Sequence, residues 1–464
     1  MPVTSGQRIQ DSRNQRHSGP MRIAWFSPVP PDCSGIAAYT AELIPHLAQL
    51  GEIDLYHAGR HDFVWRHRRD PYDLTIYQLG NSASHDFTWA YLFRYPGVLV
   101  LHDAQVHQAR ALWLLRRLEP RLHDYLAELT ASHPDAPPHL GQLFAAGLGG
   151  HLYRHWPLVS LAIRRSRLTL VHNAHLARRL AEEHPGAVVR HVEMGVADPL
   201  PALPGLPGTG TITRALDANP AHTLAIRQRH GVPADATVIG AFGGITPEKR
   251  IPQLLEAVAA SPHRQLHILL VGGRTAHYDV DEDIRRHLLE PRVHVAGYVP
   301  DEELPAYLAA SDICWCLRWP SNGETSASWL RCMAAGRPTL VTALAQLQDV
   351  PTLSVNDEGV APVSVNMDAV AIGIDPVDER RDVGHAVDAL VRDRGLRELL
   401  GANARERWRQ RHTLPQMAEA YAGAVTEALR LPTPTPTLPA HLVDDGCGTA
   451  RRLLSAAGVA ELPW

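Results

Sequence analysis

The stretch from Arg318 to Thr342 decides the fold, and it reads Arg-Trp-Pro-Ser-Asn-Gly-Glu-Thr-Ser-Ala-Ser-Trp-Leu-Arg-Cys-Met-Ala-Ala-Gly-Arg-Pro-Thr-Leu-Val-Thr. It joins a polar turn with one carboxylate, Glu324, to a helical segment that ends at Gly336, and then to an apolar strand, Thr339–Thr342. A loop that opens a helix leaves backbone N–H groups unpaired, and the helix dipole adds partial positive charge there. Such an end favours a phosphate. Because Glu324 would repel that phosphate, it is better placed to accept hydrogen bonds from hydroxyls attached to the phosphate, as on a sugar.

The length and composition of the chain bound its class. With 464 residues, the chain is too long for one ordinary hydrophobic core, so we expect two or three domains. A hydrophobic content of 45% and a charged content of 20% are typical of a soluble globular protein. A formal net charge of −4 argues against a protein that coats nucleic acid or binds strongly to acidic membranes.

The sequence carries no sign of membrane insertion or secretion. No segment reaches the roughly 18 consecutive apolar residues of a membrane helix. Residues 1–20 are polar and lack the hydrophobic segment of a signal peptide. We therefore expect a cytoplasmic protein with a disordered N-terminal tail, and peripheral contact with the inner face of a membrane stays open.

Strand-like runs alternate with longer helical segments from Met21 onward, which is typical of parallel α/β architecture. The predicted strands of the first half are Arg22–Ser27, Ile53–His57, Leu74–Gln78, Val98–Leu101, Leu168–His172 and Val188–Val192. After a segment rich in Pro and Gly, the predicted strands are Thr237–Phe242, Leu266–Val271, Val293–Ala296, Ile313–Leu317 and Thr339–Thr342. Two strand sets separated in this way indicate two Rossmann-like domains.

The predicted domain boundaries follow from these two strand sets. We expect a disordered tail at 1–20, an N-terminal domain at 21–197, a linker at 198–215, a C-terminal domain at 216–412, a helix at 413–430 that could pack back on the N-terminal domain, and a Pro-rich tail at 431–464. The segment His385–Arg430 reads as helical with a break near Thr413, and Leu431–Pro439 favours an extended conformation.

Two loops that each join a strand to a helix carry residues suited to phosphate binding. The first contains Ser34 and Gly35, and a glycine there lets a ligand approach the backbone at a helix start. The second contains Gly243-Gly244 and, further on, Lys249 and Arg250. Two cations at a helix N-terminus oppose the helix dipole, a conflict that a bound diphosphate would offset. The alternatives are an ordinary loop in the first case and two solvent-exposed side chains in the second.

Polar side chains follow the third and fourth predicted strands. Asn81 and His85 come after the third strand, and His102 comes directly after the fourth. Because ligands bind at the carboxyl ends of strands in open α/β sheets, Asn81 and His85 are candidate acceptor-side groups. Capping of a loop by Asn81 is an equally good explanation. A further loop, which includes Val299, could hold a flat base through main-chain contacts, although packing alone would explain its pattern.

In this order along one chain, the loop at Ser34, the loop at Lys249 and the segment at Glu324 resemble the GT-B glycosyltransferases of family 4, the group 1 glycosyltransferases. The resemblance covers about residues 21–430 and is more specific in the C-terminal half. It implies an α/β fold with two facing Rossmann-like domains, parallel sheets and an interdomain cleft. It also implies a nucleotide-sugar donor on the C-terminal domain, an acceptor on the N-terminal domain, and a retaining reaction without a metal.

The resemblance carries roles over to individual residues. Glu324 resembles the first glutamate of the family's E-x7-E motif, which contacts the donor sugar. Lys249 resembles the lysine that pairs with the diphosphate, and Thr325 and Ser326 fall where backbone amides meet that diphosphate. His102 resembles the histidine that approaches the transferred sugar. The resemblance therefore implies that Glu324, His102 and Lys249 are the catalytic residues.

Ser34 and Gly35 match the family's N-terminal glycine-rich loop, but two other positions depart from its pattern. Arg331 stands where the family has its second glutamate, which usually contacts the ribose, and the spacing is one short, because Arg331 lies seven residues after Glu324. Seven residues are close to two helical turns, so both side chains could share a helix face. The usual Gly-Arg ahead of the lysine is Gly243-Gly244 here, so the resemblance leaves Arg250 as a candidate for the missing cation.

We find no recognisable metal site in the sequence. Asp279-Val-Asp281 has the D-x-D form that binds a metal in another glycosyltransferase fold, but here it reads as a helix start, where carboxylates suit the dipole. The five cysteines are Cys33, Cys314, Cys316, Cys332 and Cys447, and they lack partners at metal-ligand spacing. We expect them to be reduced thiols.

These features predict a retaining hexosyltransferase that uses a nucleotide-sugar and an unknown acceptor: a glycan, a lipid-linked sugar or a small molecule. We expect no cofactor beyond the donor substrate, no metal and no nucleic-acid partner. Two rivals stay open. A sugar-nucleotide epimerase would keep the GT-B fold and change the reaction. A non-catalytic module that binds a sugar or nucleotide would account for the missing second carboxylate.

Overall fold

The computed structural model describes residues 20–116, 118–199, 220–444 and 447–459. Two compact units account for the chain. Unit 1 comprises Met1–His172, Leu176–Val192 and Ala418–Trp464, and unit 2 comprises Asn173–His175 and Glu193–Met417. The predicted tail at 1–20 and the predicted linker at 198–215 lie almost wholly outside the described residues. Among the described residues, no helix combines the length and the apolar character that are needed to cross a bilayer.

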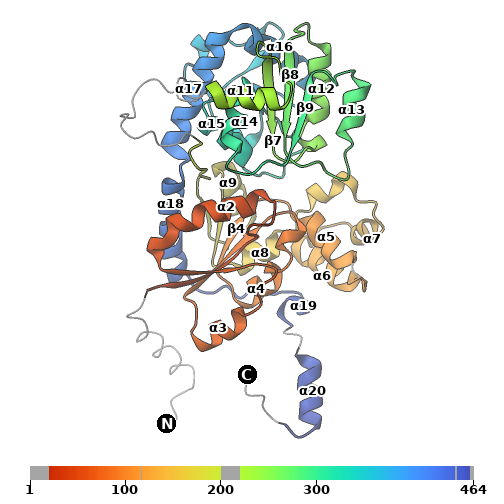
Figure 1. Cartoon of the computed structure of the whole chain (residues 1–464). Helices are drawn as coiled ribbons and strands as arrows, with labels where there is room; N and C mark the ends of the chain where they lie inside the picture. Colours follow the sequence, from red (N-terminus) through yellow and green to blue (C-terminus); the bar gives the residue numbers. More distant parts are fainter. Residues whose placement is uncertain (1–19, 117, 200–219, 445–446, 460–464) are drawn as a thin grey trace. The chain divides into compact units, whose positions relative to one another are not determined.

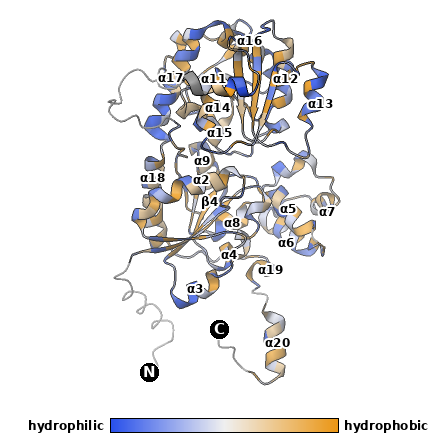
Figure 2. Cartoon of the chain, in the orientation of Figure 1, coloured by the Kyte–Doolittle hydropathy of each residue, from blue (hydrophilic) through white to orange (hydrophobic). Residues whose placement is uncertain are grey.

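Unit 1 is built on one six-stranded parallel sheet with the order β2-β1-β3-β4-β5-β6. Its strands are β1 (Arg22–Phe26), β2 (Glu52–Tyr56), β3 (Leu74–Leu79), β4 (Val98–Leu101), β5 (Leu168–Val171) and β6 (Val189–His191). The central strands β3, β4 and β5 are buried along their whole length. This continuous burial is expected where helices cover both faces of a parallel sheet, and it explains the apolar runs of the sequence (Figure 2).

The helices of unit 1 come from both ends of the chain (Figure 1). They are α2 (Gly35–Leu43), η1 (Ile44–Leu50), α3 (Phe63–Arg69), η2 (Ala83–His85), α4 (Thr88–Arg94), α5 (His107–Leu115), α6 (Leu122–Ser132), α7 (Leu140–Ala145), η3 (Gly150–His155), α8 (Ser160–Arg165), α9 (Ala174–Glu183), α18 (Leu414–Arg430), α19 (Ala440–Val443) and α20 (Gly448–Ala456). From Ala418 onward, α18 belongs to unit 1, where Tyr421 lies fully buried against Trp25 of β1.

Unit 2 contains a seven-stranded parallel sheet with the order β12-β15-β11-β10-β7-β8-β9. Its strands are β7 (Thr237–Phe242), β8 (Leu266–Val271), β9 (Val293–Gly297), β10 (Ile313–Cys316), β11 (Thr339–Thr342), β12 (Thr352–Leu353) and β15 (Ala371–Ile374). A separate antiparallel pair, β13 (Val355–Asn356) and β14 (Gly359–Val360), lies between β12 and β15 in the sequence. Two parallel-sheet α/β units are thus present, as the strand pattern predicted.

Helices cover both faces of the sheet of unit 2 (Figure 1). They are α11 (Pro220–Arg229), η4 (Pro247–Lys249), α12 (Ile251–Ala260), α13 (Val280–Arg286), α14 (Leu304–Ala310), α15 (Ala327–Ala334), η5 (Ala345–Leu347), η6 (Val363–Val365), α16 (Glu379–Arg392) and α17 (Arg394–Arg411). Ile239 of β7 packs in the cluster that includes α12 and α16, whereas its neighbour Val238 packs with α14 on the other face. This alternation is the two-residue period of a strand.

Candidate functional site

The strand order of unit 2 creates a switch point between β7 and β10. From β7 the chain proceeds through β8 and β9 on one side, and from β10 through β11 on the other. The loops after β7 and β10 therefore leave the same edge in opposite directions, which is where open α/β sheets bind ligands. Two hydrogen bonds tie the loops together: Trp319 N–H donates to Glu248 O (2.8 Å), and Trp315 Nε1–H donates to Lys249 O (2.9 Å).

Glu324 lies in the loop after β10, and both of its carboxylate oxygens are bound inside that loop. Arg318 Nη1 donates to Oε1 at 2.5 Å, while Ser321 Oγ (2.9 Å) and Asn322 N (2.6 Å) donate to Oε2. Only 11% of the Glu324 side chain is exposed. Burial raises the pKa of Glu324, but the charge of Arg318 and these hydrogen bonds outweigh burial, so the pKa lies below its ordinary value. The carboxylate is therefore ionised and fixed in orientation.

Lys249 lies on the β7 side of the same switch point. Its Nζ donates to Phe242 O. A Cβ at Gly243, which has φ +90°, would lie 2.2 Å from Lys249 Nζ and 3.2 Å from Ser328 Oγ, so the ammonium packs directly against the glycine backbone. Burial, reinforced by the charge of Arg318, lowers the pKa of Lys249 to about 7. Because this pKa is near neutral, a nearby charge can change the protonation of Lys249.

Arg250 is engaged elsewhere in unit 2. Its Nε donates to Glu379 Oε1 at 2.7 Å, and its Nη2 pairs with Glu379 Oε2 in a bidentate ion pair. Glu379 begins α16 and is buried. From the resemblance, Arg250 is a candidate for the cation missing from the motif, and two cations at a helix N-terminus favour a nearby anion. The structure supplies that anion within the protein, since Glu379 neutralises Arg250.

Helix α15 follows Glu324 after a short gap. Ser326 is its N-cap, and the Ser326 hydroxyl accepts a hydrogen bond from Trp329 N (3.3 Å). Thr325 lies between Glu324 and this cap, so it is outside the helix. The helix begins at Ala327, and Arg331 lies in its last turn. The prediction that Glu324 and Arg331 share a helix face is therefore wrong, because Glu324 precedes the helix.

The remaining predicted donor-side residues lie at the same edge of the sheet. Gly244 is exposed after β7, and a Cβ there would meet nothing closer than Thr246 Cγ2 at 3.9 Å. Val299 follows β9, is partly buried and packs on the apolar cluster around α14. Packing therefore accounts for Val299, and its proposed contact with a base stays a prediction.

His102 lies at the carboxyl edge of the sheet of unit 1 and is buried. Its Nε2 is 2.6 Å from Gln78 Oε1, and its ring stands perpendicular to that of Tyr39 at a centroid distance of 4.9 Å. The His172 ring lies 5.2 Å away. Burial lowers the pKa of His102 well below its ordinary value, and the imidazoles of His172 and His85 lower it further. His102 is therefore neutral at neutral pH.

The two predicted acceptor-side residues have structural partners. Asn81 Oδ1 accepts from Ala109 N (3.0 Å), which caps α5, and Asn81 N donates to Asp103 Oδ2 (2.7 Å). His85 is buried, and its Nδ1 donates to Gln78 O (2.9 Å). Burial lowers the pKa of His85 to about 4. The side chain of Asn81 therefore binds the first turn of α5 and not its own loop, and an acceptor role stays a prediction.

Ser34 and Gly35 form the start of α2 at the end of β1. Ser34 is the N-cap, and its hydroxyl accepts from Ala37 N (3.1 Å). Gly35 is exposed, and a Cβ built on it would meet no atom within 4 Å. Gly35 is therefore not required by packing in unit 1. Open space at a helix N-terminus is compatible with the predicted approach of a ligand.

Comparison with known families bears directly on unit 2. Residues 236–372, which include β7, Lys249, Glu324 and α15, match the family model described as glycosyl transferases group 1. Over these residues, the chain is similar to the group 1 glycosyltransferases. The chain is also 31% identical over 137 residues to the 2-deoxystreptamine glucosyltransferase of Streptomyces kanamyceticus. That alignment covers 29% of the chain and 35% of the length of the relative.

Solved structures extend the similarity to both units. Anabaena HepE, in complex with UDP and glucose, aligns with a TM-score of 0.54 over 88% of this chain and 99% of its own, at 16% identity. Sucrose-phosphate synthase from Thermosynechococcus elongatus aligns with a TM-score of 0.59 over 88% of this chain and 98% of its own, at 16% identity. WaaG, a glycosyltransferase of lipopolysaccharide biosynthesis, aligns with a TM-score of 0.54 at 13% identity. The chain has the GT-B fold, as predicted.

Two residues of unit 2 were assigned no role from the sequence. Arg318 donates a hydrogen bond to Glu324, and Ser328, like Lys249, lies against the backbone of Gly243. The signal for Arg318 was present, because it directly follows the apolar strand that precedes Glu324. Ser328 carried no signal, since a serine in the first turn of a helix is common.

The rejected metal motif is a helix start, as predicted. Asp279 is the N-cap of α13 and accepts from Glu282 N (3.0 Å), while Asp281 pairs with Arg274. Within the described residues, no group of three or more His, Cys, Asp or Glu side chains is placed to hold a metal ion. The five cysteines are free thiols, and Cys316 Sγ lies 3.9 Å from Cys332 Sγ.

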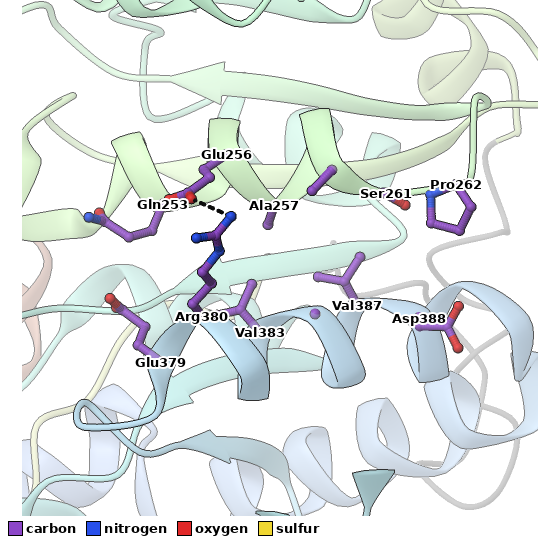
Figure 3. A pocket seen from close by; sticks show the side chains of 12 residues that line it. Gln253, Glu256, Ala257, Ser261, Pro262, Glu379, Arg380, Val383, Val387 and Asp388 are labelled. Carbon is purple, nitrogen blue, oxygen red and sulfur yellow. Dashed lines mark ion pairs between the residues drawn. The ribbon is translucent and has the colours of Figure 1, made fainter. Parts of the chain in front are cut away.

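A separate cavity of about 320 Å³ lies between α12 and α16 of unit 2 (Figure 3). Its floor includes Ala257, Val383 and Val387, and Arg380 reaches across it to Glu256 (3.3 Å). None of the predicted site residues lines this cavity, although Glu379, the partner of Arg250, does. The predicted donor site is therefore elsewhere, at the carboxyl edge of the sheet.

Proposed function

We propose that this protein is a retaining glycosyltransferase that moves a hexosyl group from a nucleotide-sugar to an acceptor. One observation carries the proposal: an amine, an ionised carboxylate and a helix N-terminus converge at the switch point of unit 2. Lys249 comes from the loop after β7, whereas Glu324 and the start of α15 come from the segment after β10. The match of residues 236–372 to the group 1 glycosyltransferase model supports the same reaction class.

The departing nucleoside diphosphate develops negative charge as the glycosidic bond breaks. We infer that Lys249 and the N–H groups at the start of α15 stabilise this charge, because they are fixed before the reaction begins. Ionised Glu324 accepts hydrogen bonds from sugar hydroxyls, since a carboxylate oxygen can accept more than one. Since Lys249 and the helix dipole supply positive charge, we expect transfer to continue in EDTA.

On unit 1, we infer that His102 contacts the transferred sugar as a neutral imidazole held by Gln78. We assign no protein side chain as a general base, and the leaving phosphate takes the proton of the acceptor hydroxyl. The choice of a first donor rests on two relatives: one is named a glucosyltransferase, and HepE was solved with UDP and glucose. UDP-glucose is therefore the first donor to test. The acceptor class, whether a glycan, a lipid-linked sugar or a small molecule, is left to the assay.

A donor screen followed by one substitution tests the proposal. UDP-, ADP- and GDP-sugars are compared by the thermal shift that each produces, and the best donor enters a transfer assay with a mixture of acceptors. Glu324→Gln should reduce kcat by about 10²- to 10³-fold, because it removes a charge that orients the sugar. Glu406→Gln is the matched control, since Glu406 pairs with Arg409 on the exposed face of α17.

The outcomes separate the candidate functions. A kcat for Glu324→Gln that stays close to the native value shows that the catalytic assignment is wrong. Conversion of the donor to an epimer in the absence of an acceptor identifies an epimerase instead. A donor that binds the native protein without any transfer identifies a binding module.

A further inference from the structure

The switch point has a second cation, Arg318, in the loop after β10, which is hydrogen-bonded to the loop of Lys249 through Trp319 N and Glu248 O. We propose that Arg318, and not Arg250, is the arginine that binds the diphosphate of the donor together with Lys249. This inference rests on the proposed function and names a further residue of the same site.

Arg250 is poorly placed for that role because it is already committed. Its guanidinium makes a bidentate ion pair with Glu379, and both side chains are largely buried, with 21% and 10% exposed. A diphosphate would have to displace Glu379, which would leave a buried carboxylate without its partner. The sequence pattern points to a missing arginine near Lys249, since Gly243-Gly244 stands where the resembling family has Gly-Arg.

Arg318 is better placed than Arg250 to bind a ligand at the switch point. It follows β10, and its backbone N–H donates to Thr342 Oγ1 of the adjacent strand β11 (2.9 Å), which fixes its position at the sheet edge. Its Nη1 holds Glu324 Oε1 at 2.5 Å. A guanidinium carries five N–H donors, and 34% of the side chain is exposed. Arg318 can therefore bind a ligand while it holds Glu324.

The charges of Arg318, Lys249 and Glu324 at the switch point also favour the binding of an anion. Arg318 and Lys249 are close enough for the charge of Arg318 to disfavour the protonated amine of Lys249, in addition to the effect of burial. Glu324 balances only one of these two cations. A diphosphate bound between Arg318 and Lys249 would balance both and would favour protonation of Lys249.

Binding of free UDP and UMP to the purified full-length protein tests the inference. UDP carries the diphosphate without the sugar, so its affinity does not depend on contacts between Glu324 and sugar hydroxyls. Arg318→Ala should weaken UDP binding by about 10- to 100-fold and should change UMP binding less, because a charged hydrogen bond to the second phosphate is lost. Arg318→Lys should fall between native and Arg318→Ala, since it keeps the charge and loses the bidentate geometry. If the donor screen selects ADP or GDP, that nucleotide and its monophosphate replace UDP and UMP.

Three variants control the measurement. The pair Arg250→Gln with Glu379→Gln removes both charges of the other ion pair and should change UDP affinity by less than about threefold. Arg409→Ala, an exposed arginine of α17, should leave UDP affinity unchanged. Glu324→Gln should leave UDP affinity equal or higher, because it removes a negative charge near the diphosphate.

The inference and the proposed function fail in different ways. If the native protein binds none of UDP, ADP and GDP, the proposed function is wrong and the inference with it. If the native protein binds UDP and both Arg318 variants bind it equally well, only the inference is overturned. Equal losses in Arg318→Ala and Glu324→Gln would show that Arg318 acts by positioning Glu324, which also overturns it.

Discussion

At the scale of single residues, the amine of Lys249 makes donor binding depend on pH. Its pKa lies at about 7, so roughly half of the amine is protonated at neutral pH. Only the protonated form attracts a diphosphate. We therefore expect the affinity for UDP-glucose, whose diphosphate does not titrate in this range, to fall about tenfold between pH 6 and pH 8. Titration calorimetry in buffers of different ionisation enthalpy should show proton uptake on binding at pH 7.5.

Lys249→Met is the reference for that pH dependence. This variant should bind UDP-glucose more weakly and show no dependence on pH over the same interval. A native affinity that stays constant from pH 6 to pH 8 would contradict the placement of Lys249 on the diphosphate. The same amine also affects folding: its folded pKa of about 7 lies below the ordinary value of 10.5, so the unfolded chain binds more protons. This contribution makes stability rise with pH from about 7 to about 10.5.

The ion pair of Arg250 leads to a prediction about stability. Arg250 adopts the left-handed conformation (φ 58°, ψ 32°), which disfavours any residue with a Cβ. Arg250→Ala loses the pair with buried Glu379 and should destabilise the protein by about 2 kcal/mol. Arg250→Gly loses the same pair and relieves the backbone, so it should be about 1 kcal/mol more stable than Arg250→Ala. Chemical denaturation of both variants measures this difference.

Equal stabilities of the alanine and glycine variants would show that the backbone at this position is not strained. Neither variant should change UDP affinity by more than about threefold if Arg318 is the diphosphate-binding arginine.

Some residues of the candidate site were predictable from the sequence, and others were not. The pattern placed Glu324, Lys249 and Gly243 in one site, and they lie at one switch point. The pattern pointed to Arg250 because two adjacent cations at a helix start can be recognised in a sequence. The neutralisation of Arg250 by Glu379, 129 residues away, cannot. The partners Arg318 and Ser328 are set by how loops fold back, which no short pattern records.

At the scale of elements, Ser34 at the start of α2 has a structural role, whereas the adjacent Gly35 is a candidate for ligand binding. Ser34 caps the helix, so Ser34→Ala should cost about 1 kcal/mol of stability. Gly35→Ala introduces a methyl group into open space and should leave stability equal or slightly higher. If a ligand approaches this turn, Gly35→Ala should nevertheless lower kcat/KM by about tenfold or more. Thermal unfolding and transfer assays on the two variants measure the two effects.

An unchanged kcat/KM in Gly35→Ala would place the ligand away from this turn. A loss of stability in Gly35→Ala would instead show that the space around it is filled.

The elements themselves were largely predictable. The sequence correctly located Val98–Leu101, Thr237–Phe242, Leu266–Val271 and Thr339–Thr342, because each is an apolar run that is buried on both faces. It missed β15 (Ala371–Ile374), although this strand lies inside the sheet between β11 and β12. Four residues, one of them Gly373, give a weak propensity signal, and pairing on both sides supplies the rest.

At the scale of the whole molecule, the segment from Pro434 to Leu442 packs on unit 1 and is not a free tail. His441 Nε2 lies 2.7 Å from Glu128 Oε1, inside a buried pair of Glu128 with Arg110. Leu442 is buried, and Arg165 donates to Pro434 O. The Pro-rich composition predicted an extended chain, but the anchoring contacts come from residues more than 260 positions earlier.

Two deletions test this attachment. Deletion from Thr433 onward should destabilise unit 1 by about 3 kcal/mol, because it removes buried Leu442 and the contacts of His441. This loss corresponds to a fall in Tm of about 6–12 °C. Deletion from Gly448 onward removes α20, which buries no described residue, and should leave Tm within about 1 °C. Equal effects of the two deletions would show that the segment Thr433–Val443 does not stabilise unit 1.

The pairing of Tyr421 with β1 and α2 has a consequence for biosynthesis. The ring of Tyr421 packs against Trp25 at a centroid distance of 5.7 Å, and its hydroxyl lies 2.5 Å from that of Tyr39, so the first strand and helix of unit 1 are completed by a helix some 380 residues downstream. A ribosome releases β1 and α2 first and α18 only after every strand of unit 2. Unit 2 can therefore finish folding on the nascent chain while the Trp25 face of unit 1 is still uncovered. During synthesis this uncovered face is where we expect chaperones to bind.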